Sequence, residues 1–277
     1  MRVMVAGATG VIGRALVPLL RGVGHEVTAL SRTGDPGGVL DGTGARVVAV
    51  DALDRGAMRA ALAEAVPDAV VHLMTAIPTQ IRPRRLAREF AATNRLRREG
   101  TRNLLEAAET VGVGRVVAQG LAYAYDPAGA GPATEDDPFW VDPPRPFRPV
   151  LAALEELEQR TTAVGGTVLR FGHLYGPGSI YAANGSTVAA VRAGRMPIVG
   201  SGESVFSFTH AGDAASAIVA ALDRPTGVGA LNIVDDDPTP VREWLPALAE
   251  LLDAPAPSRR PDDAAERGCG GLQRRRR

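Results

Sequence analysis

The chain has 277 residues and no net charge, and 45% of its residues are hydrophobic, 22% charged and 4% aromatic, a composition typical of a globular protein rather than a disordered one. All 31 residues counted as Lys or Arg are Arg, so the chain lacks lysine. This excludes Schiff-base catalysis, lysine-containing phosphate-binding loops and Tyr-x-x-x-Lys pairs, because each needs an ammonium group. One cysteine, Cys269, and four scattered histidines predict neither disulfides nor a metal site. No apolar run approaches the roughly 20 residues of a membrane span, so we expect a cytoplasmic protein without membrane contact.

Short apolar runs alternate with amphipathic stretches in the first half, a pattern typical of repeated βα units. Right-handed crossovers between parallel strands then give an α/β fold with a Rossmann-type doubly wound parallel sheet. Strands are predicted at residues 3–6, 26–30, 46–50, 69–73 and 115–119. Helices are predicted at residues 11–21, 54–65 and 85–111, the last being either two helices or one bent helix.

The second half is less regular. Seven prolines between residues 126 and 149 predict a functional loop or lid. The elements expected beyond it are a helix at 150–164, a strand at 167–171, a Gly-rich turn, short strands at 197–199 and 205–209, and helices at 211–222 and 241–252. We therefore expect a Rossmann domain over residues 1–165, to whose sheet the strand at 167–171 returns, and a small C-terminal substrate lobe over 172–256. Residues 257–277 have no apolar period and are predicted to form a disordered tail.

A glycine-rich segment follows the first predicted strand and opens the first helix, as a dinucleotide-binding turn requires. Gly7 permits the tight turn, Gly10 lets a pyrophosphate approach the backbone, and Gly13 lets the helix pack closely on the strand. The helix N-terminus then faces the anion with unpaired N–H groups and the positive end of its dipole. A purely structural turn is the alternative. The predicted cofactor contacts in this segment are Gly7, Thr9, Gly10, Val11, Ile12 and Gly13.

The end of the second strand indicates which dinucleotide is bound. An acidic residue there would bind a ribose 2′-hydroxyl, but this chain has Ser31 and Arg32. Arg32 can pair with a 2′-phosphate and Ser31 can donate a hydrogen bond, so NADP is preferred over NAD; the alternative for Arg32 is a solvated surface side chain. Asp51 is placed either to accept the adenine amino group or to cap the next helix. The other predicted cofactor contacts are Ala52, Leu53, Leu73, Met74 and Gln119.

Further motifs accompany the glycine turn. They are Asp51-Ala52-Leu53, His72-Leu73, the segments 100–108 and 170–178, Phe208-Thr209-His210 with Asp213, and Asn232-Ile233. In these motifs the chain resembles the NAD-dependent epimerase/dehydratase family, within the extended and atypical short-chain dehydrogenases/reductases, over about residues 1 to 253. The resemblance implies an NAD(P)-binding Rossmann domain, a small substrate lobe, a small-molecule substrate and a homodimer formed through the helix near residues 85–111.

The chain departs from this family at the catalytic positions. The family uses a Ser or Thr after the fifth strand and a Tyr-x-x-x-Lys helix, in which the Lys lowers the Tyr pKa and holds the nicotinamide ribose. Leu121, Val150 and Leu154 occupy those three positions here, with Glu158 at the acidic position four residues further on. Keto-reduction or sugar epimerisation by that mechanism is therefore disfavoured.

Tyr125 and His173 are the remaining candidates for catalysis. Tyr125 matches the family's post-strand tyrosine, which lines the substrate pocket; without a cationic neighbour, its phenol stays protonated and can donate a hydrogen bond. His173 follows the sixth strand in the Gly-rich turn, where it can act as an acid or base or simply pack beside the nicotinamide. Gln119 can orient a carbonyl group or satisfy backbone groups at the sheet edge.

These observations predict an atypical oxidoreductase or isomerase that acts with NADP or NAD on a small polar or sugar-like carbonyl compound. A non-catalytic regulator or scaffold that senses NADP is the alternative, because all three catalytic residues are missing together.

An arginine-rich stretch lies in the helix before Gly100 and Thr101, with eight Arg and only two Glu in residues 82–102. It predicts either a solvated basic face or steering of an anionic substrate. Asn94, Arg97 and Glu99 resemble an Asn-x-x-Arg-x-x-Gly-Thr pattern of atypical family members. Because no aromatic residues are interleaved with these charges, nucleic-acid binding is not predicted.

Overall fold

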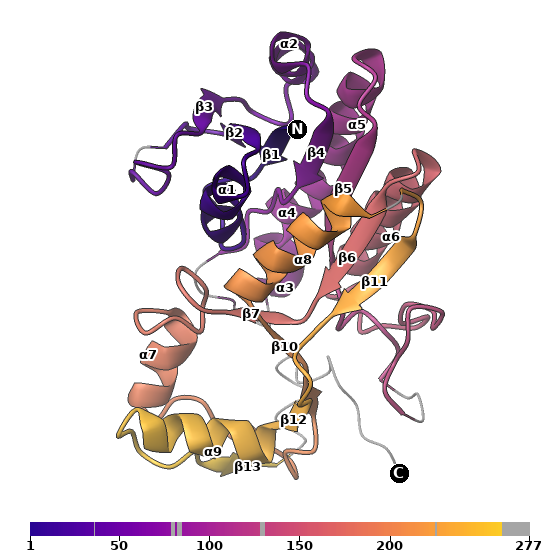
Figure 1. Ribbon diagram of the computed structural model, residues 1–277. Helices are drawn as coiled ribbons and strands as arrows, with labels where there is room; N and C mark the ends of the chain where they lie inside the picture. The colour runs from indigo at the N-terminus through magenta and orange to yellow at the C-terminus, as the bar shows by residue number, and fades with distance from the viewer. Residues whose placement is uncertain (36, 79–80, 82–84, 128–130, 225, 262–277) are drawn as a thin grey trace.

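The computed structural model describes residues 1–35, 37–78, 81, 85–127, 131–224 and 226–261 (Figure 1). A central sheet of seven strands has the order β11-β6-β5-β4-β1-β2-β3, and every neighbouring pair is parallel. Its strands are β1 (Arg2–Ala6), β2 (Glu26–Ser31), β3 (Arg46–Ala49), β4 (Ala69–His72), β5 (Arg115–Leu121), β6 (Thr167–Phe171) and β11 (Gly229–Ile233). This order confirms the predicted doubly wound Rossmann fold.

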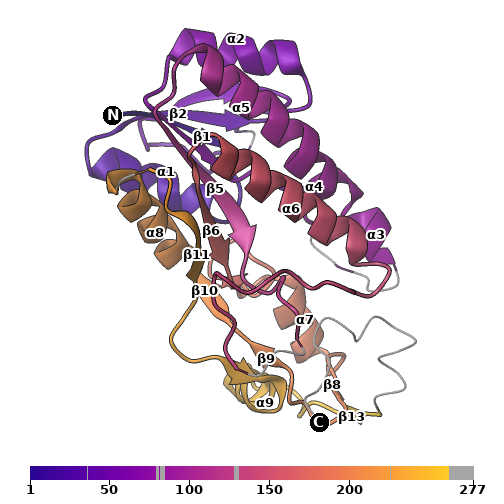
Figure 2. The same ribbon diagram turned by 90° about the vertical axis from the view of Figure 1, so that its right-hand side faces the viewer.

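Helices cover both faces of the sheet (Figure 2). On one face lie α1 (Gly13–Gly22) and α8 (Ala211–Asp223), and on the other lie α2 (Arg55–Ala65), α5 (Thr101–Thr110) and α6 (Arg148–Ala163). Side chains of β1 alternate between the two faces. Val3 and Val5 pack in the cluster that contains α1 and α8, whereas Met4 and Ala6 pack in the cluster that contains α2 and α5. The apolar run in β1 is therefore buried from both sides, as is typical of a parallel sheet.

The region predicted as one bent helix or two is a series of short helical segments. It contains α3 (Leu86–Glu89), α4 (Ala91–Arg95), a π-helical turn η2 (Leu96–Gly100) and then α5. A π turn holds an extra residue per turn and is frequent at functional sites. This turn lies against α6, on the side of the sheet that carries the expected catalytic positions.

A small lobe lies beyond the carboxyl edge of the sheet (Figure 1). Its helices are α7 (Ser186–Arg192) and α9 (Val241–Leu251). Its short strands pair as β7 (His173–Tyr175) with β10 (Phe208–His210), β9 (Val205–Phe206) with β12 (Thr239–Pro240), and β8 (Ile198–Val199) with β13 (Arg259–Arg260). Val191, Ile198, Leu245 and Ala249 form its core.

Three features differ from the sequence-based expectation. The strand β11 was not predicted, and together with α8 it returns from the range assigned to the lobe to the large sheet and its helical layer. His173 lies in the short strand β7 rather than in a turn. The first residues of the predicted disordered tail are paired, because the amide of Ile198 donates to the carbonyl of Ser258 and β13 continues beside β8. The rest of that tail, residues 262–277 with Cys269, lies outside the described residues.

Among the described residues, no helix has both the length and the apolar character needed to cross a bilayer. The same residues contain no cluster of three or more His, Cys, Asp or Glu side chains able to hold a metal ion.

Candidate active site

The turn between β1 and α1 is a cradle of bare backbone at the carboxyl edge of the sheet. Gly7 has a φ of +92°, and a Cβ on it would lie 2.7 Å from the carbonyl carbon of Leu73. A Cβ on Gly13 would lie 2.3 Å from the carbonyl oxygen of Ala8. Both glycines are therefore required by close backbone approaches. The carbonyl of Leu30 accepts from the amides of Gly7 and Ala8, at 3.0 and 3.2 Å, which ties the turn to β2.

The start of α1 presents positive potential to this cradle. The first turn of the helix contains no acidic residue, so its N-terminal amides and dipole are not neutralised. Arg14 folds back over the turn and donates to the carbonyl oxygens of Thr9 and Gly10, both at 3.3 Å. It also lies against Gly178, where a Cβ would come within 2.3 Å of its Nη1 atom. These residues fit the pyrophosphate of a dinucleotide. Arg14 was missed by the sequence analysis, although its position directly after Gly13 is a signal.

The end of β2 lies beside the glycine turn. The hydroxyls of Ser31 and Thr9 are 3.3 Å apart. Arg32 is exposed, and in the described part of the chain no carboxylate forms an ion pair with it. A neutral hydroxyl and an arginine, rather than a carboxylate, therefore occupy this position.

The loop after β3 is fixed by local hydrogen bonds. Asp54, not Asp51, caps α2 by accepting from a backbone amide in its first turn at 3.0 Å. Asp51 instead accepts from the amide of Leu53 at 3.0 Å. Asn103 of α5 donates to the carbonyl of Ala52 at 2.9 Å and holds the loop against the helical layer. The capping alternative for Asp51 is thus removed.

The remaining predicted cofactor residues are distributed along the same turn and sheet edge. Val11 is half-buried beside the glycines, and Ile12 is only 2% exposed within the core, so a contact from Ile12 would come from its backbone. Leu73 and Met74 are buried just after β4, and Gln119 is half-buried near the end of β5.

The three expected catalytic positions form part of a continuous apolar cluster. Leu121 at the end of β5 is 5% exposed, and Val150 and Leu154 of α6 are 1% and 0% exposed. They pack in one cluster with Phe90, Trp140 and Phe147, among others. The site therefore lacks a hydroxyl, phenol or ammonium group at these positions, and side-chain packing occupies the space instead.

Tyr125 belongs to a buried polar network. Arg170 donates to the carboxylate of Glu158 at 3.0 and 2.7 Å and to the phenol oxygen of Tyr125 at 2.7 Å. The phenol in turn donates to Oδ1 of Asn232 at 2.6 Å. Burial raises the pKa of Tyr125, with Arg170 opposing that rise. The expectation that Tyr125 has no cationic neighbour was wrong, because Arg170 of β6 reaches across to it from the next strand.

The proline-rich loop is docked onto this network. The Glu135 carboxylate accepts from the backbone amide of Asn232 at 2.6 Å, and its carbonyl accepts from Arg170 at 3.3 Å. The guanidinium carbon of Arg170 lies 4.7 Å from the ring centroid of Phe139, within cation–π distance. The described part of residues 126–149 therefore rests on β6 and β11.

His173 lies in a stack of rings. The centroid of the Tyr123 ring lies 4.2 Å from that of the His173 ring, with an interplanar angle of 7°. For the Phe206 ring, the centroid distance to His173 is 4.4 Å and the interplanar angle is 24°. Burial lowers the pKa of His173 to about 4, so the imidazole is neutral near pH 7. His173 therefore packs between aromatic rings of the chain itself, whereas packing beside the nicotinamide and an acid–base role both stay predictions.

The stack extends into the lobe as a group of rings that we call the aromatic cluster. The ring of Tyr181 is 5.5 Å from that of Phe208, which is 5.6 Å from that of Trp244. Every member is half-buried, so every member keeps some accessible surface. The indole N–H of Trp244 has no hydrogen-bond partner within the described residues. The members of the aromatic cluster are Tyr123, His173, Tyr181, Phe206, Phe208 and Trp244.

A second buried arginine, Arg97, lies in η2 and is 2% exposed. Burial lowers its pKa to about 10, so it remains a cation near pH 7. It lies near His72 at the end of β4, since its charge adds to burial in lowering the His72 pKa to about 4. Nδ1 of His72 accepts from the amide of Met74 at 3.2 Å, which leaves Nε2 to donate to the hydroxyl of Thr101 at 2.7 Å. The charge of Arg97 also opposes the rise that burial causes in the Tyr123 pKa.

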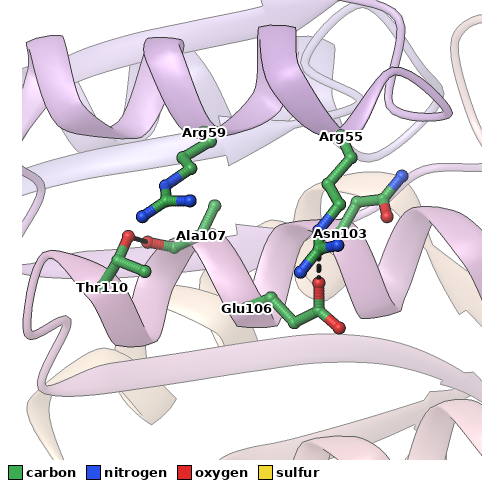
Figure 3. Close-up of a pocket in the computed structure, with 6 residues that line it drawn as sticks. All are labelled: Arg55, Arg59, Asn103, Glu106, Ala107 and Thr110. Atoms are coloured by element: carbon green, nitrogen blue, oxygen red, sulfur yellow. Dashed lines mark hydrogen bonds and ion pairs between the residues drawn. The ribbon is translucent and has the colours of Figure 1, made fainter.

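A shallow pocket outside this edge lies between α2 and α5 (Figure 3). Arg55 forms an ion pair with Glu106 there at 2.9 Å. The lining residues are Arg55, Arg59, Asn103, Glu106, Ala107 and Thr110, none of which belongs to the glycine turn or the aromatic cluster. We therefore place the functional site at the carboxyl edge of the sheet and not in this pocket.

The strand order, the glycine cradle and the lobe beyond the sheet edge define a dinucleotide-binding Rossmann protein with a separate substrate-binding region. The sequence profile of the NAD dependent epimerase/dehydratase family matches residues 3–234. The chain belongs to that family, as the sequence motifs predicted.

Relatives within the family carry different activities. A 3-diazoavenalumate denitrifying reductase from a Streptomyces species is 44% identical over a 278-residue alignment that covers 98% of this chain and 88% of that protein. A UDP-N-acetyl-alpha-D-glucosaminuronate decarboxylase from Bacillus cytotoxicus is 26% identical, over 90% of this chain and 80% of that protein. The UDP-glucose 4-epimerase of Thermus thermophilus, solved with NAD, matches with a TM-score of 0.74 at 27% identity, over 94% and 86% of the two chains. The chain is thus an atypical, oxidoreductase-like member of an NAD-dependent enzyme family.

Proposed function

We propose that the chain is an NADPH-dependent reductase that removes nitrogen from a diazo-substituted aromatic carboxylate. The relative at 44% identity is named as a denitrifying reductase of a diazo compound. When bound, the reduced cofactor supplies a hydride, and hydride plus a diazonium group R–N2+ gives R–H and N2 with charge and electrons balanced. This reaction differs from reduction of a ketone, because no oxygen atom has to receive a proton.

The observation that carries this proposal is the apolar cluster at the three catalytic positions. In the family's usual mechanism, a hydroxyl, a phenol and an ammonium group together deliver a proton to a carbonyl oxygen. Leu121, Val150 and Leu154 cannot deliver one, and all three are buried in the same apolar cluster. A reduction that needs no such delivery is compatible with these residues.

The aromatic cluster supports a planar substrate. Its rings are half-buried and keep some accessible surface at the junction of the sheet edge and the lobe, and aromatic rings pack on one another in offset or edge-to-face arrangements. The sequence analysis predicted a small polar or sugar-like carbonyl compound; the cluster favours a conjugated aromatic compound in its place.

We propose that Tyr125 and His173 position other groups and do not transfer protons. The phenol proton of Tyr125 is donated to Asn232, and His173 is neutral between two rings. Tyr125→Phe is expected to change turnover by less than about threefold, whereas loss of a general acid changes it by about a hundredfold or more. A hundredfold loss in Tyr125→Phe at unchanged stability would restore the catalytic role.

The cofactor would lie along the glycine turn. Its pyrophosphate would be held by backbone amides of residues 7–13 and by Arg14, and its adenine would lie near Asp51. Arg32 and Ser31 at the end of β2 favour a 2′-phosphate and hence NADP.

Titration with NADPH and NADH tests this cofactor preference. Arg32→Ala is expected to weaken NADPH binding about tenfold to a hundredfold and to leave NADH binding unchanged, because only NADPH carries the phosphate. Arg59→Ala, an exposed arginine of α2, serves as the control and should change neither. A wild-type preference for NADH, or an unchanged preference in Arg32→Ala, would rule out the assignment.

The reaction is tested with an arenediazonium carboxylate and NADPH deuterated at the transferable position. Nitrogen release, NADPH oxidation and deuterium in the product are expected in equal amounts. Tight NADPH binding without any turnover would favour the alternative of a non-catalytic NADP-sensing regulator.

The homodimer through residues 85–111 is a separate prediction, which light scattering of the purified chain checks.

A further inference from the structure

None of the roles described so far accounts for Arg97. Its side chain is almost fully buried, and its Nη1 atom has no hydrogen-bond partner among the described residues. Buried charges in proteins are normally paired and hydrogen-bonded, because removing an ion from water is strongly unfavourable. The nearest titratable groups do not supply a negative charge, since His72 uses both ring nitrogens in other hydrogen bonds and Tyr123 has a raised pKa.

Two carboxylates near this helical region are paired with other arginines. Glu99 pairs with the exposed Arg95 at 3.0 Å, and Glu156 of α6 pairs with the exposed Arg98 at 3.5 Å. Within the described part of the arginine-rich stretch, Arg95 and Arg98 are therefore ion-paired at the surface, whereas Arg97 is buried and forms no ion pair with a described carboxylate. Neither a solvated basic face nor the surrounding ion pairs explain the buried one.

A second unpartnered polar atom lies one turn away. The side-chain Oδ1 of Asn94 is buried and has no hydrogen-bond partner within the described residues. Asn94 is 6% exposed and Arg97 is 2% exposed, and they are three residues apart where α4 runs into η2, so they offer a buried acceptor and a buried donor in the same short segment. The π turn η2 contains Arg97 and leads into α5, whose Thr101 holds His72 at the end of β4. This places the pair at the carboxyl edge of the sheet, on the Tyr123 side of the aromatic cluster.

We propose that Arg97 binds the carboxylate of the substrate, whose rings pack against the aromatic cluster. A guanidinium group can donate two parallel hydrogen bonds to a carboxylate, which would supply both the missing charge and the missing acceptor. The identity of the anion as an aromatic carboxylate rests on the proposed function. The binding of an organic anion by Arg97 rests on the geometry alone, so the two are tested separately.

The experiment is calorimetric binding of cinnamate and of its uncharged methyl ester to the full chain saturated with NADP+. Wild type is expected to bind cinnamate at least about tenfold more tightly than the ester. Arg97→Met should lose this preference while keeping NADP+ affinity unchanged. Arg97→Lys, which keeps the charge but not the paired donors, should retain part of the preference. Arg98→Met, one residue away on the surface, is the matched control and should behave as wild type.

Equal binding of acid and ester by wild type would overturn the proposal before any variant is made. A full preference in Arg97→Met would overturn it as well. If cinnamate binding depends on Arg97 but no diazo compound is reduced, the anion site stands and the proposed reaction fails. If a diazo compound is reduced and Arg97→Met leaves its KM unchanged, the reaction stands and the anion site fails.

Discussion

The two buried arginines, Arg170 and Arg97, have opposite surroundings. Arg170 in β6 donates to Glu158 and to Tyr125 and packs over Phe139, so its charge and its donors are used within the chain. Arg97 in η2 has a similar degree of burial and an unused donor. Both residues are buried arginines, but the charge of Arg170 is paired within the chain, whereas the charge of Arg97 is not paired with a described residue. Burial of a charge therefore indicates a binding role only where the partners of that charge are missing.

The largest expected change in the free energy of unfolding comes from removing the carboxylate partner of Arg170. Glu158→Ala leaves Arg170 buried without its carboxylate and is expected to lower the free energy of unfolding by about 3–5 kcal/mol. Urea unfolding measures this change. Glu156→Ala, on the same helix but with a carboxylate 35% exposed, is the control and should cost about 0–1 kcal/mol. A loss below about 1 kcal/mol in Glu158→Ala would show that the Arg170 network is not structural.

Acid should destabilise the region around Arg97. The folded-state pKa of His72 is about 4, below the value of about 6.5 expected in the unfolded chain. As the pH falls, the unfolded state therefore takes up a proton on His72 before the folded state does. The contribution of His72 to the free energy of unfolding is complete above about pH 6.5 and is lost progressively down to about pH 4. The loss is expected to approach about 3 kcal/mol. His173, lowered to about 4 by burial, acts in the same direction.

Urea unfolding at several pH values, from about 7.5 down to about 4.5, measures this dependence. His72→Gln, which keeps a polar side chain but cannot titrate, should flatten the profile in part. A profile that is the same in His72→Gln and wild type would contradict the assignment of the effect to this residue.

The smallest expected change in the free energy of unfolding comes from substituting Arg97, and it has the opposite sign to the loss in Glu158→Ala. Arg97→Met removes an unpaired buried charge and keeps most of the side-chain volume, so stability is expected to stay constant or rise by about 1 kcal/mol. The pKa of His72 should rise at the same time, because a neighbouring cation is gone; an NMR titration of its ring protons reads this directly. Arg170→Met, which leaves Glu158 unpaired, is the contrasting variant and should be destabilised. A similar loss in both variants would make Arg97 a structural residue.

Sequence periodicity was sufficient to predict the positions of most strands of the large sheet. Each strand from β1 to β6 was predicted to within a few residues of its observed bounds, because most of these runs are apolar and buried. β11 was missed because Gly229–Ile233 is short, half-buried and at the edge of the sheet, so its apolar signal is weak. Strands of two or three residues in the lobe depend on pairing with distant segments, which periodicity does not encode.

The candidate site was predictable only where a motif fixed it. The glycine turn and the apolar replacements at Leu121, Val150 and Leu154 follow from sequence position alone. The aromatic cluster combines side chains from Tyr123 to Trp244 that only the fold brings together. The burial of Arg97 was predictable from the sequence. Arg97, Gly100 and Leu104 follow the spacing of one helix face, and Gly100 and Leu104 are small or apolar and buried, so Arg97 is expected on the face that packs against the sheet.

The π turn η2 has an evolutionary consequence. A turn of this kind arises when one residue is inserted into an α-helix, and one residue corresponds to a rotation of about 100° around the helix axis. Deleting a single residue within Leu96–Gly100 would rotate the preceding segment by that amount without substituting any side chain. The side of the helix on which Arg97 lies therefore depends on the number of residues in this turn as well as on their side chains.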